Sequence, residues 1–321
     1  MQSFISHWNK FLKEGIDPET GEPDFKYYAF DWDDNIMMMP TKILVKDSEG
    51  NVIGISTEEF AHLRADIGVK PEVDYEGHKI VGYAPEPFRN FRTEGDKQFI
   101  EDSKTAPTGP AWGAFVECLN GGSVFAIITA RGHNPETLRQ AVYNLIVADR
   151  GGISKKRIYK SLKKYSMYDT NLGPKELINE YLNKCQFSPV SYDGPGSTVE
   201  ASATGPEKAK EEELRRFMTN IEQMNAGLPT KLGFSDDDKR NIEHMSKIFS
   251  NKDVKLFYTG PEKDYEPEQV PETIPDSEEE DTPVVRNKQL PRFIESKNRV
   301  NRTLKEGIAT KMFRTKSYKQ K

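Results

Sequence analysis

Residues 26–36 read KYYAFDWDDNI, and the interpretation of the whole chain starts from this stretch. Its first half is a short apolar run that predicts a buried β-strand, and the strand leads directly into Asp31 and Asp33. Two carboxylates spaced i and i+2 repel each other unless a cation or a shared proton offsets their charge. The simplest explanation is a divalent hard cation, held by oxygen ligands at the carboxyl end of a buried strand.

The composition predicts one well-packed domain with polar appendages. The chain has 321 residues, of which 35% are hydrophobic and 30% are charged. Cys118 and Cys185 do not make a disulfide framework or a zinc site, so we expect a reducing compartment, the cytoplasm. The first residues lack the pattern of a signal peptide, and no apolar run approaches the length that spans a bilayer. We therefore expect a cytoplasmic protein that does not enter the membrane.

The pattern along the chain predicts a main domain with an insertion near its start. Residues 1–23 predict a short amphipathic helix and a turn, and residues 24–260 predict the main domain. Within that domain, residues 40–110 are read as an insertion: a β-hairpin is predicted over 43–55, and residues 57–110 are rich in proline, glycine and charge. We expect this insertion to form a small cap over a site at the end of the first strand, without a hydrophobic core of its own.

After the insertion, strands alternate with helices, which predicts a parallel α/β sheet with right-handed crossovers. Residues 123–129 form the strongest buried strand, because their continuous apolar run is typical of a sheet covered on both faces. Ligands of such sheets bind at the carboxyl ends of the strands, where Asp31, Thr129 and Asp236 are expected. Asp238 is expected to cap the helix that follows. The other predicted strands cover 187–191, 231–235 and 254–258. The predicted helices cover 57–66, 111–120, 135–148, 174–184, 207–223 and 239–250.

The last part of the chain predicts an acidic linker over 261–285 and a basic tail over 286–321. Residues 261–281 hold ten acidic residues and one Lys, with four prolines, which predicts disorder. Residues 286–321 hold twelve Lys or Arg against two Glu. Such a tail can recruit nucleic acid or an acidic partner. The equally open alternative is a solvated tail that folds back on the acidic linker.

Three motifs occur in the order and the context of one known family. They are FDWDDNI at 30–36, IITAR at 127–131 and GFSDD at 233–237, each at the end of a predicted core strand. Jointly they resemble the motifs of the haloacid dehalogenase (HAD) superfamily, over roughly residues 24–260. The resemblance implies a Rossmann-like sheet and a Mg²⁺ cofactor. It also implies a hydrolase that cleaves a small phosphate monoester through an aspartyl-phosphate.

The resemblance also implies roles for individual residues. Asp31 matches the nucleophile of the family, and Asp33 matches the general acid and base two residues later. Phosphatases of the family have this second Asp. Thr129 matches the hydroxyl that binds the transferring phosphoryl group. Asp236 and Asp237 match the acidic pair that completes the Mg²⁺ site with Asp31, and Asp33 is a fourth candidate ligand.

The predicted substrate contacts come from the loop after the first strand and from the Thr-Ala-Arg motif. They are Asn35, Thr129, Ala130 and Arg131. Arg131 can make a bidentate phosphate contact. His133 follows the motif and is a further candidate for a substrate contact, whereas the five histidines show no metal-ligand spacing. The sequence departs from the family at Asp34 and Asn35, where a Gly-Thr pair is usual, and Asp34 adds negative charge near an anionic substrate.

The family also needs a lysine that offsets the charge of the nucleophile and the phosphate. Lys210 shares the helical phase of the apolar residues Leu214 and Phe217, so we expect it to point toward the interior. Lys208 falls on the polar face of the same predicted helix, and Lys175 begins an earlier one. Lys210 is the first candidate, and the other two stay open.

Three functions compete at this level. The leading hypothesis is a Mg²⁺-dependent phosphomonoesterase whose substrate is a nucleotide or a phosphorylated nucleic-acid end. The second is a catalytically inactive scaffold of the same fold that binds partners through its charged tails. The third, a phosphoacceptor of the response-regulator type, is disfavoured because it would carry the acceptor Asp on a later strand.

Overall fold

The computed structural model describes residues 25–165, 167–169, 171–195, 197, 205–224, 230–249 and 254–261. The chain divides into two compact units, Met1–Pro267 and Glu268–Lys321, and every described residue belongs to the first. The boundary falls inside the predicted acidic linker. The predicted helix and turn of residues 1–23, nearly all of the linker, and the basic tail lie outside the described residues.

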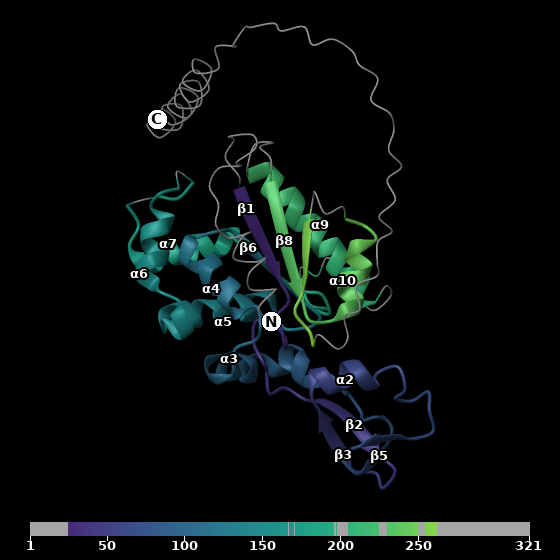
Figure 1. The fold of residues 1–321 in the computed structure, drawn as a ribbon. Coiled ribbons are helices and arrows are strands. Elements are labelled where there is room, and N and C mark those ends of the chain that lie inside the picture. The colour runs from purple at the N-terminus through teal and green to yellow at the C-terminus, as the bar shows by residue number, and fades with distance from the viewer. Residues whose placement is uncertain are drawn as a thin grey trace, which may run out of the picture. The chain divides into compact units, whose positions relative to one another are not determined.

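A five-stranded parallel sheet forms the centre of the first unit (Figure 1). Its strand order is β7-β6-β1-β8-β9, and every neighbouring pair is parallel. The predicted parallel α/β sheet is therefore confirmed. The strands are β1 (Phe25–Phe30), β6 (Phe125–Thr129), β7 (Gln186–Pro189), β8 (Thr230–Asp236) and β9 (Val254–Tyr258).

The order of the strands reverses at β1. From β1 the chain proceeds to β6 and β7 on one side, and it then crosses to β8 and β9 on the other side. In open parallel sheets the ligand site lies outside the carboxyl ends of the strands at such a reversal. The expected place for a ligand site is therefore among the residues that follow β1 and β8.

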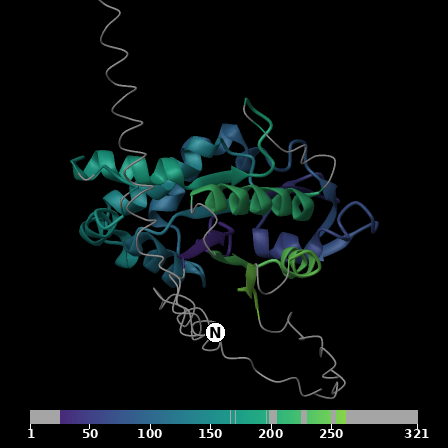
Figure 2. The ribbon, with the colours of Figure 1, turned by 90° about the horizontal axis from the view of Figure 1, so that it is seen from above.

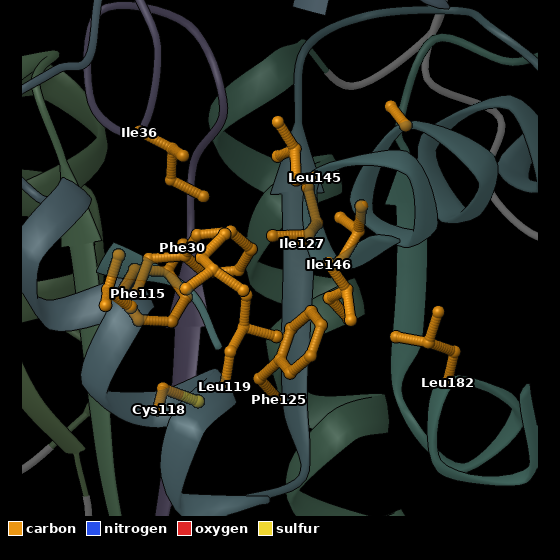
Figure 3. Packing of buried hydrophobic residues seen from close by; sticks show 14 of the residues in the cluster. Phe30, Ile36, Phe115, Cys118, Leu119, Phe125, Ile127, Leu145, Ile146 and Leu182 are labelled. Carbon is orange, nitrogen blue, oxygen red and sulfur yellow. The ribbon is translucent and has the colours of Figure 1, made fainter. Parts of the chain in front are cut away.

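Both faces of the sheet are buried. Alternate side chains of β1 point to opposite faces, and those on each face lie in a core cluster. Tyr28 and Phe30 belong to one core cluster, and Tyr27 and Ala29 belong to another. Figure 3 shows the first cluster, in which the ring of Phe115 meets those of Phe30 and Phe125 edge to face. Such apolar strands, buried on both faces, were predicted from the sequence.

Two groups of helices cover the two faces. Residues of α3 to α7 complete the cluster of Phe30, and residues of α9 and α10 complete the cluster of Ala29. Figures 1 and 2 show α6 and α7 on the opposite side of the sheet from α10. The helices are α3 (Asp96–Thr105), α4 (Trp112–Gly121), α5 (Pro135–Val147), α6 (Lys155–Leu162), α7 (Pro174–Lys184), α9 (Pro206–Met224) and α10 (Lys239–Ser246).

Helix starts follow the capping signals of the sequence. Asn134 caps α5 by accepting from the backbone N–H of Glu136, with Pro135 in the first turn. Asp238 caps α10, as predicted, by accepting from the N–H of Arg240. Among the described residues, no helix is both long enough and apolar enough to cross a membrane.

The insertion forms a four-stranded antiparallel sheet in the order β3-β2-β5-β4. The predicted hairpin is present as β2 and β3. The expectation that the insertion lacks a core was wrong, because Ile43, Ile67, Val73 and Ile80 pack together in a buried cluster of their own. These side chains come from short segments with polar residues between them, so no single stretch looked apolar. The elements are β2 (Ile43–Asp47), β3 (Val52–Ile55), α2 (Thr57–Leu63), β4 (Val73–Tyr75) and β5 (His78–Tyr83).

Candidate active site at the carboxyl edge of the sheet

The loop after β1 is held against β8. The N–H of Asp31 donates to the carbonyl of Ser235 at 2.9 Å, which extends the pairing of β1 and β8 by one residue. The chain then makes one tight turn, in which the N–H groups of Ile36 and Met37 both donate to the carbonyl of Trp32. Asp34 lies inside this turn with a φ of +53°, in the left-handed region that Asp and Asn tolerate better than most residues.

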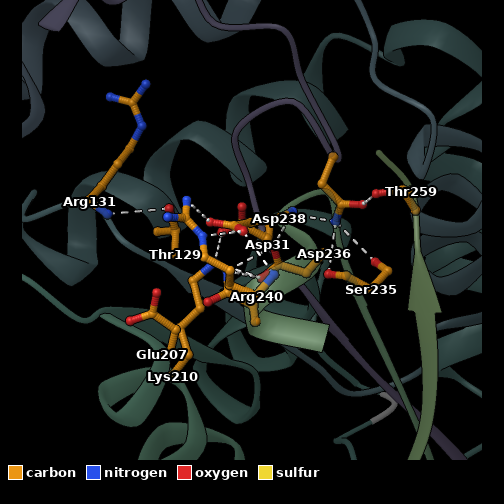
Figure 4. Close-up of polar contacts among 12 residues, drawn as sticks. Asp31, Thr129, Arg131, Glu207, Lys210, Ser235, Asp236, Asp238, Arg240 and Thr259 are labelled. Atoms are coloured by element: carbon orange, nitrogen blue, oxygen red, sulfur yellow. Dashed lines mark hydrogen bonds and ion pairs between the residues drawn. The ribbon is translucent and has the colours of Figure 1, made fainter. Parts of the chain in front are cut away.

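Asn35 fixes this loop from inside the protein. Its side chain is fully buried, and its Nδ2 donates to the carbonyl of Asp31 at 2.9 Å and to the hydroxyl of Ser235 at 3.0 Å. Its Oδ1 accepts from the hydroxyl of Thr259 at 2.8 Å (Figure 4). The structure thus places Asn35, a predicted substrate contact, as a link between the ends of three neighbouring strands.

Three carboxylates meet at the ends of β1 and β8. Asp31, Asp236 and Asp237 each offer one oxygen, and these oxygens lie within 4.8 Å of one another. The Oδ1 of Asp31 is buried and forms an ion pair with the ammonium of Lys210 at 3.1 Å, outside ideal hydrogen-bond geometry. A set of carboxylate oxygens this close together fits a hard divalent cation. Asp33 is not part of this group.

Lys210 is the cation of the cluster. Its Nζ donates to Asp236 Oδ2 at 2.7 Å and lies 3.1 Å from Asp31 Oδ1, and its side chain is only 2% exposed (Figure 4). Lys208 instead pairs with the buried carboxylate of Glu211, away from the three carboxylates, and Lys175 is exposed in the first turn of α7. Of the three predicted lysines, the structure therefore brings only Lys210 to the carboxylates.

The electrostatics of the cluster favour an additional positive charge. Burial raises the pKa of Asp31 to about 8, and Asp236 and Asp33 add to this shift while Lys210 opposes it. Burial, with Asp236 next, also raises the pKa of Asp237 well above its ordinary value. Burial alone would lower the pKa of Lys210, but Asp236 and Asp31 outweigh it and raise that pKa. One ammonium thus faces three carboxylates, which is the imbalance that a divalent cation removes.

Asp236 is oriented by groups that the sequence did not single out. Asn241 donates through Nδ2 to both carboxylate oxygens, at 2.9 and 3.0 Å, and the N–H of Asp238 donates to Oδ1 at 2.9 Å. Asn241 lies in the first turn of α10, three residues beyond the acidic run. That spacing is the only signal by which the sequence could have indicated it.

The Thr-Ala-Arg motif follows β6, the neighbour of β1 on the other side. Thr129 is the last residue of that strand and is almost fully buried, and its hydroxyl accepts from the N–H of Arg131 at 3.4 Å. Ala130 is exposed. The motif therefore lies at the same edge of the sheet as the acidic cluster, because β6 and β1 run parallel and side by side.

Arg131 makes its bidentate contact with protein. Its Nε and Nη2 donate to the two carboxylate oxygens of Asp33, each at 2.7 Å. Figure 4 shows the Arg131 side chain pointing away from Asp31 and Asp236. The structure thus joins two residues that the sequence assigned separately, one to proton transfer and one to substrate binding.

Helix α2 of the insertion contacts the site at both of its ends. At its start, the hydroxyl of Thr57 donates to the carboxylate of Asp34. At its end, Arg64 Nη2 lies 3.3 Å from Glu207 Oε1 and 3.3 Å from Asp238 Oδ2. Burial, with Asp33 next, raises the pKa of Asp34 to about 6. The insertion therefore lies over the carboxyl ends of β1 and β8, the place expected of a cap (Figure 1).

The site is assembled from four separate stretches of the chain: the loop after β1, the motif after β6, the start of α9, and the run that follows β8. Each stretch is held by hydrogen bonds to its neighbours. A comparison of the chain with protein-family models, with curated proteins and with solved structures found no match in any of the three.

Proposed function

We propose that this protein is a Mg²⁺-dependent phosphomonoesterase with a Rossmann-like fold of the HAD type. The observation that carries the proposal is the Oδ1 of Asp31, a buried carboxylate oxygen that lies among the three carboxylates and is ion-paired with the ammonium of Lys210 at 3.1 Å. An oxygen with a free lone pair beside a fixed cation, at the reversal of strand order, is suited to attack an electrophilic phosphorus.

Asp31, Asp236 and Asp237 would hold the metal. Their oxygens are the donors that Mg²⁺ prefers, and they lie within 4.8 Å of one another. When bound, Mg²⁺ would neutralise the carboxylates and polarise the phosphoryl oxygens.

In the first half of the reaction, an Asp31 oxygen forms a bond to phosphorus while the bond to the ester oxygen breaks. Asp33 gives a proton to the departing oxygen, so the products of this step are an aspartyl-phosphate and an alcohol. Lys210 offsets the charge that gathers between Asp31 and the phosphoryl group, and the Thr129 hydroxyl binds a phosphoryl oxygen. Each Asp33 oxygen accepts one hydrogen bond from Arg131, which leaves a lone pair on each for the proton.

In the second half, Asp33 takes a proton from water as the water oxygen attacks the aspartyl-phosphate. The bond between phosphorus and Asp31 breaks, inorganic phosphate leaves, and both carboxyl groups return to their starting states. The insertion excludes bulk water and limits substrate size, because α2 lies over the site between Asp34 and Asp238. The substrate classes that suit this arrangement are a nucleotide and a phosphorylated nucleic-acid end, the latter if the basic tail recruits polyanions.

The test is hydrolysis of an aryl phosphate with Mg²⁺ or with a chelator, for the wild type, Asp31→Asn and Lys208→Met. We expect Mg²⁺-dependent turnover in the wild type and in Lys208→Met, and a loss of at least about 10³-fold in Asp31→Asn. A cap can reject generic esters, so nucleotides and 3′- or 5′-phosphorylated oligonucleotides complete the panel. If no ester turns over, and neither Mg²⁺ nor a phosphate-mimicking fluoride complex binds, the proposal fails.

The scaffold alternative is favoured by one observation. Asp33, the only proposed acid and base, is held on both oxygens by a buried guanidinium, as in a structural ion pair. A scaffold would bind Mg²⁺ and the fluoride complex but would not turn over any ester in the panel, which separates it from the phosphatase.

A further inference from the structure

The guanidinium of Arg131 lies in a closed socket. The side chain is 1% exposed, and its guanidinium carbon lies 4.6 Å from the centre of the Phe91 ring and 4.8 Å from that of Phe99. A guanidinium is planar and stacks on aromatic faces, whereas a flexible ammonium does not. The two rings therefore restrict the movement of the planar guanidinium.

Around the edge of that plane, four contacts use nearly all donors of Arg131. Nε and Nη2 donate to Asp33, and Nη2 also donates to the hydroxyl of Thr41 at 3.0 Å. Nη1 lies 3.0 Å from Nε2 of His133. Little remains with which to bind a phosphate, and the geometry of Asp33 is set by this one side chain.

The contact between Arg131 and His133 determines the tautomer of the histidine. Arg131 can only donate, so His133 Nε2 must accept and carries no proton. The proton of the ring is then on Nδ1, which donates to Asp96 Oδ1 at 2.9 Å. Asp96 also accepts from the N–H of Asn134, at 3.3 Å.

The surroundings of His133 keep it neutral. Its side chain is fully buried, and the charged groups that face it are Arg131 on its own loop, Asp96 at the start of α3, and Asp33 after β1. Burial, followed by Arg131, lowers the pKa of His133 to about 4, against the opposing effect of the two carboxylates. The neutral form is thus the one present at physiological pH.

The same socket joins the two ends of the insertion. Thr41 precedes β2, and Phe91 lies in the short helix η1 (Arg89–Phe91) that follows β5. The carbonyl of Phe91 also accepts from the N–H of Gly132, the neighbour of Arg131, at 2.8 Å. On its other side Gly132 packs against the backbone of Ser191. A Cβ at position 132 would come within 2.7 Å of the Ser191 carbonyl oxygen, so this position requires glycine. Arg131 thus contacts the segments through which the chain leaves and re-enters the main domain.

We propose that Arg131 is a positioning residue, which orients the Asp33 carboxylate and fixes both junctions of the insertion, and that it depends on a neutral, Nδ1-protonated His133 held by Asp96. In this assignment Arg131 does not bind the substrate phosphate. The consequence for catalysis rests on the proposed phosphatase function, whereas the tautomer and the junction do not.

The first test therefore needs no activity. The ¹⁵N-labelled full chain is studied by long-range ¹H–¹⁵N NMR of the five histidine rings, and the His133 signals are assigned by their loss in His133→Gln. We expect the Nδ1–H tautomer, unchanged as the pH falls from about 8 to 5.5. An Nε2–H tautomer, or protonation of His133 within that range, would overturn the proposal, whatever the protein does with phosphate esters.

The second test separates positioning from substrate binding. In Arg131→Lys and His133→Phe we expect kcat to fall at least about tenfold, with a changed pH profile, because Asp33 loses its orientation. KM and the inhibition constant of inorganic phosphate should both stay within about twofold of the wild-type values, since the phosphoryl contacts are made by other residues. His133→Gln keeps an acceptor and a donor and should retain most of the activity. A large rise in both constants at unchanged kcat would show that Arg131 binds the phosphate, contrary to the proposal.

Controls keep the second test decisive. Arg139→Lys makes the same change on α5, where Arg139 contacts Glu136, Asn179 and Asn183 away from the site, and it should behave as the wild type. If Arg131→Lys does not fold, Thr41→Val removes a single acceptor of Arg131 and should give a smaller fall in kcat of the same kind. If the wild type itself has no activity, the proposed function fails. The NMR result then decides by itself whether Arg131 and His133 are arranged as proposed.

Discussion

The ammonium of Lys210 lies 3.1 Å from the Oδ1 of Asp31, and both groups are buried. A lysine in the interior is stable only when carboxylates offset its desolvation, and here Asp236 supplies the second one, at 2.7 Å. The pair thus stabilises the end of the central strand and fixes the Asp31 carboxylate, whose Oδ1 keeps a second lone pair for chemistry. Stability and activity should both depend on it.

Replacing Lys210 by Met should lower the free energy of unfolding by about 3–5 kcal/mol at pH 8, because it leaves buried carboxylates without their cation. Urea unfolding measures this. Lys208→Met, on the same helix, should cost less, about 1 kcal/mol, because the buried carboxylate of Glu211 keeps Arg215 and His244 as partners. The double variant Asp31→Asn/Lys210→Met should recover part of the loss. An equal loss of unfolding free energy in Lys210→Met and Lys208→Met would contradict the assignment of Lys210 as the cation of the carboxylate cluster.

Mg²⁺ should stabilise the wild type against unfolding, by about 2.7 kcal/mol at a hundred times its dissociation constant. Asp237→Asn should weaken Mg²⁺ binding in calorimetry and abolish most of the stabilisation, because it removes one oxygen of the cluster. Asp238→Asn is the matched control, since it removes the same charge one residue later and asparagine caps α10 equally well. Loss of Mg²⁺ binding in both variants would show a general effect of charge and not a site.

The core of the fold could be predicted from the sequence because its signals are local. The strand before Asp31 and the strand before Thr129 are continuous apolar runs, and the phase of Lys210 on its helix follows from the spacing to Leu214. The core of the insertion could not be predicted in this way, because Ile67 and the residues that pack with it come from short, mostly polar segments.

The pairing of Asp33 with Arg131 could not be predicted, because the residues are 98 positions apart and each has a plausible separate role. Nothing in the local pattern of Arg131 indicates that two aromatic rings from the far end of the insertion enclose it. The same holds for Asp96, which reaches His133 only through tertiary packing. Local periodicity specifies elements, whereas such long-range polar contacts depend on how the elements meet.

The turn at Asp34 should tolerate asparagine but not alanine. Asp34 has a φ of +53° and accepts from the hydroxyl of Thr57, and asparagine can keep both features. We expect Asp34→Asn to change the free energy of unfolding by less than about 0.5 kcal/mol, and Asp34→Ala to lower it by about 1–2 kcal/mol. Urea unfolding at neutral pH distinguishes them. An alanine variant as stable as the asparagine variant would mean that the left-handed turn is not maintained.

His133 should make the protein less stable in acid. In the unfolded chain its pKa is about 6.5, whereas in the folded protein burial lowers it to about 4. Between these values the unfolded state binds more protons, so stability falls as the pH falls, by about 2 kcal/mol at pH 5 from this group alone. The difference in unfolding free energy between the wild type and His133→Gln should therefore shrink by that amount from pH 7.5 to 5. A constant difference for His133→Gln would show that the buried ring gains its proton as readily as in the unfolded chain, which the Arg131 contact forbids.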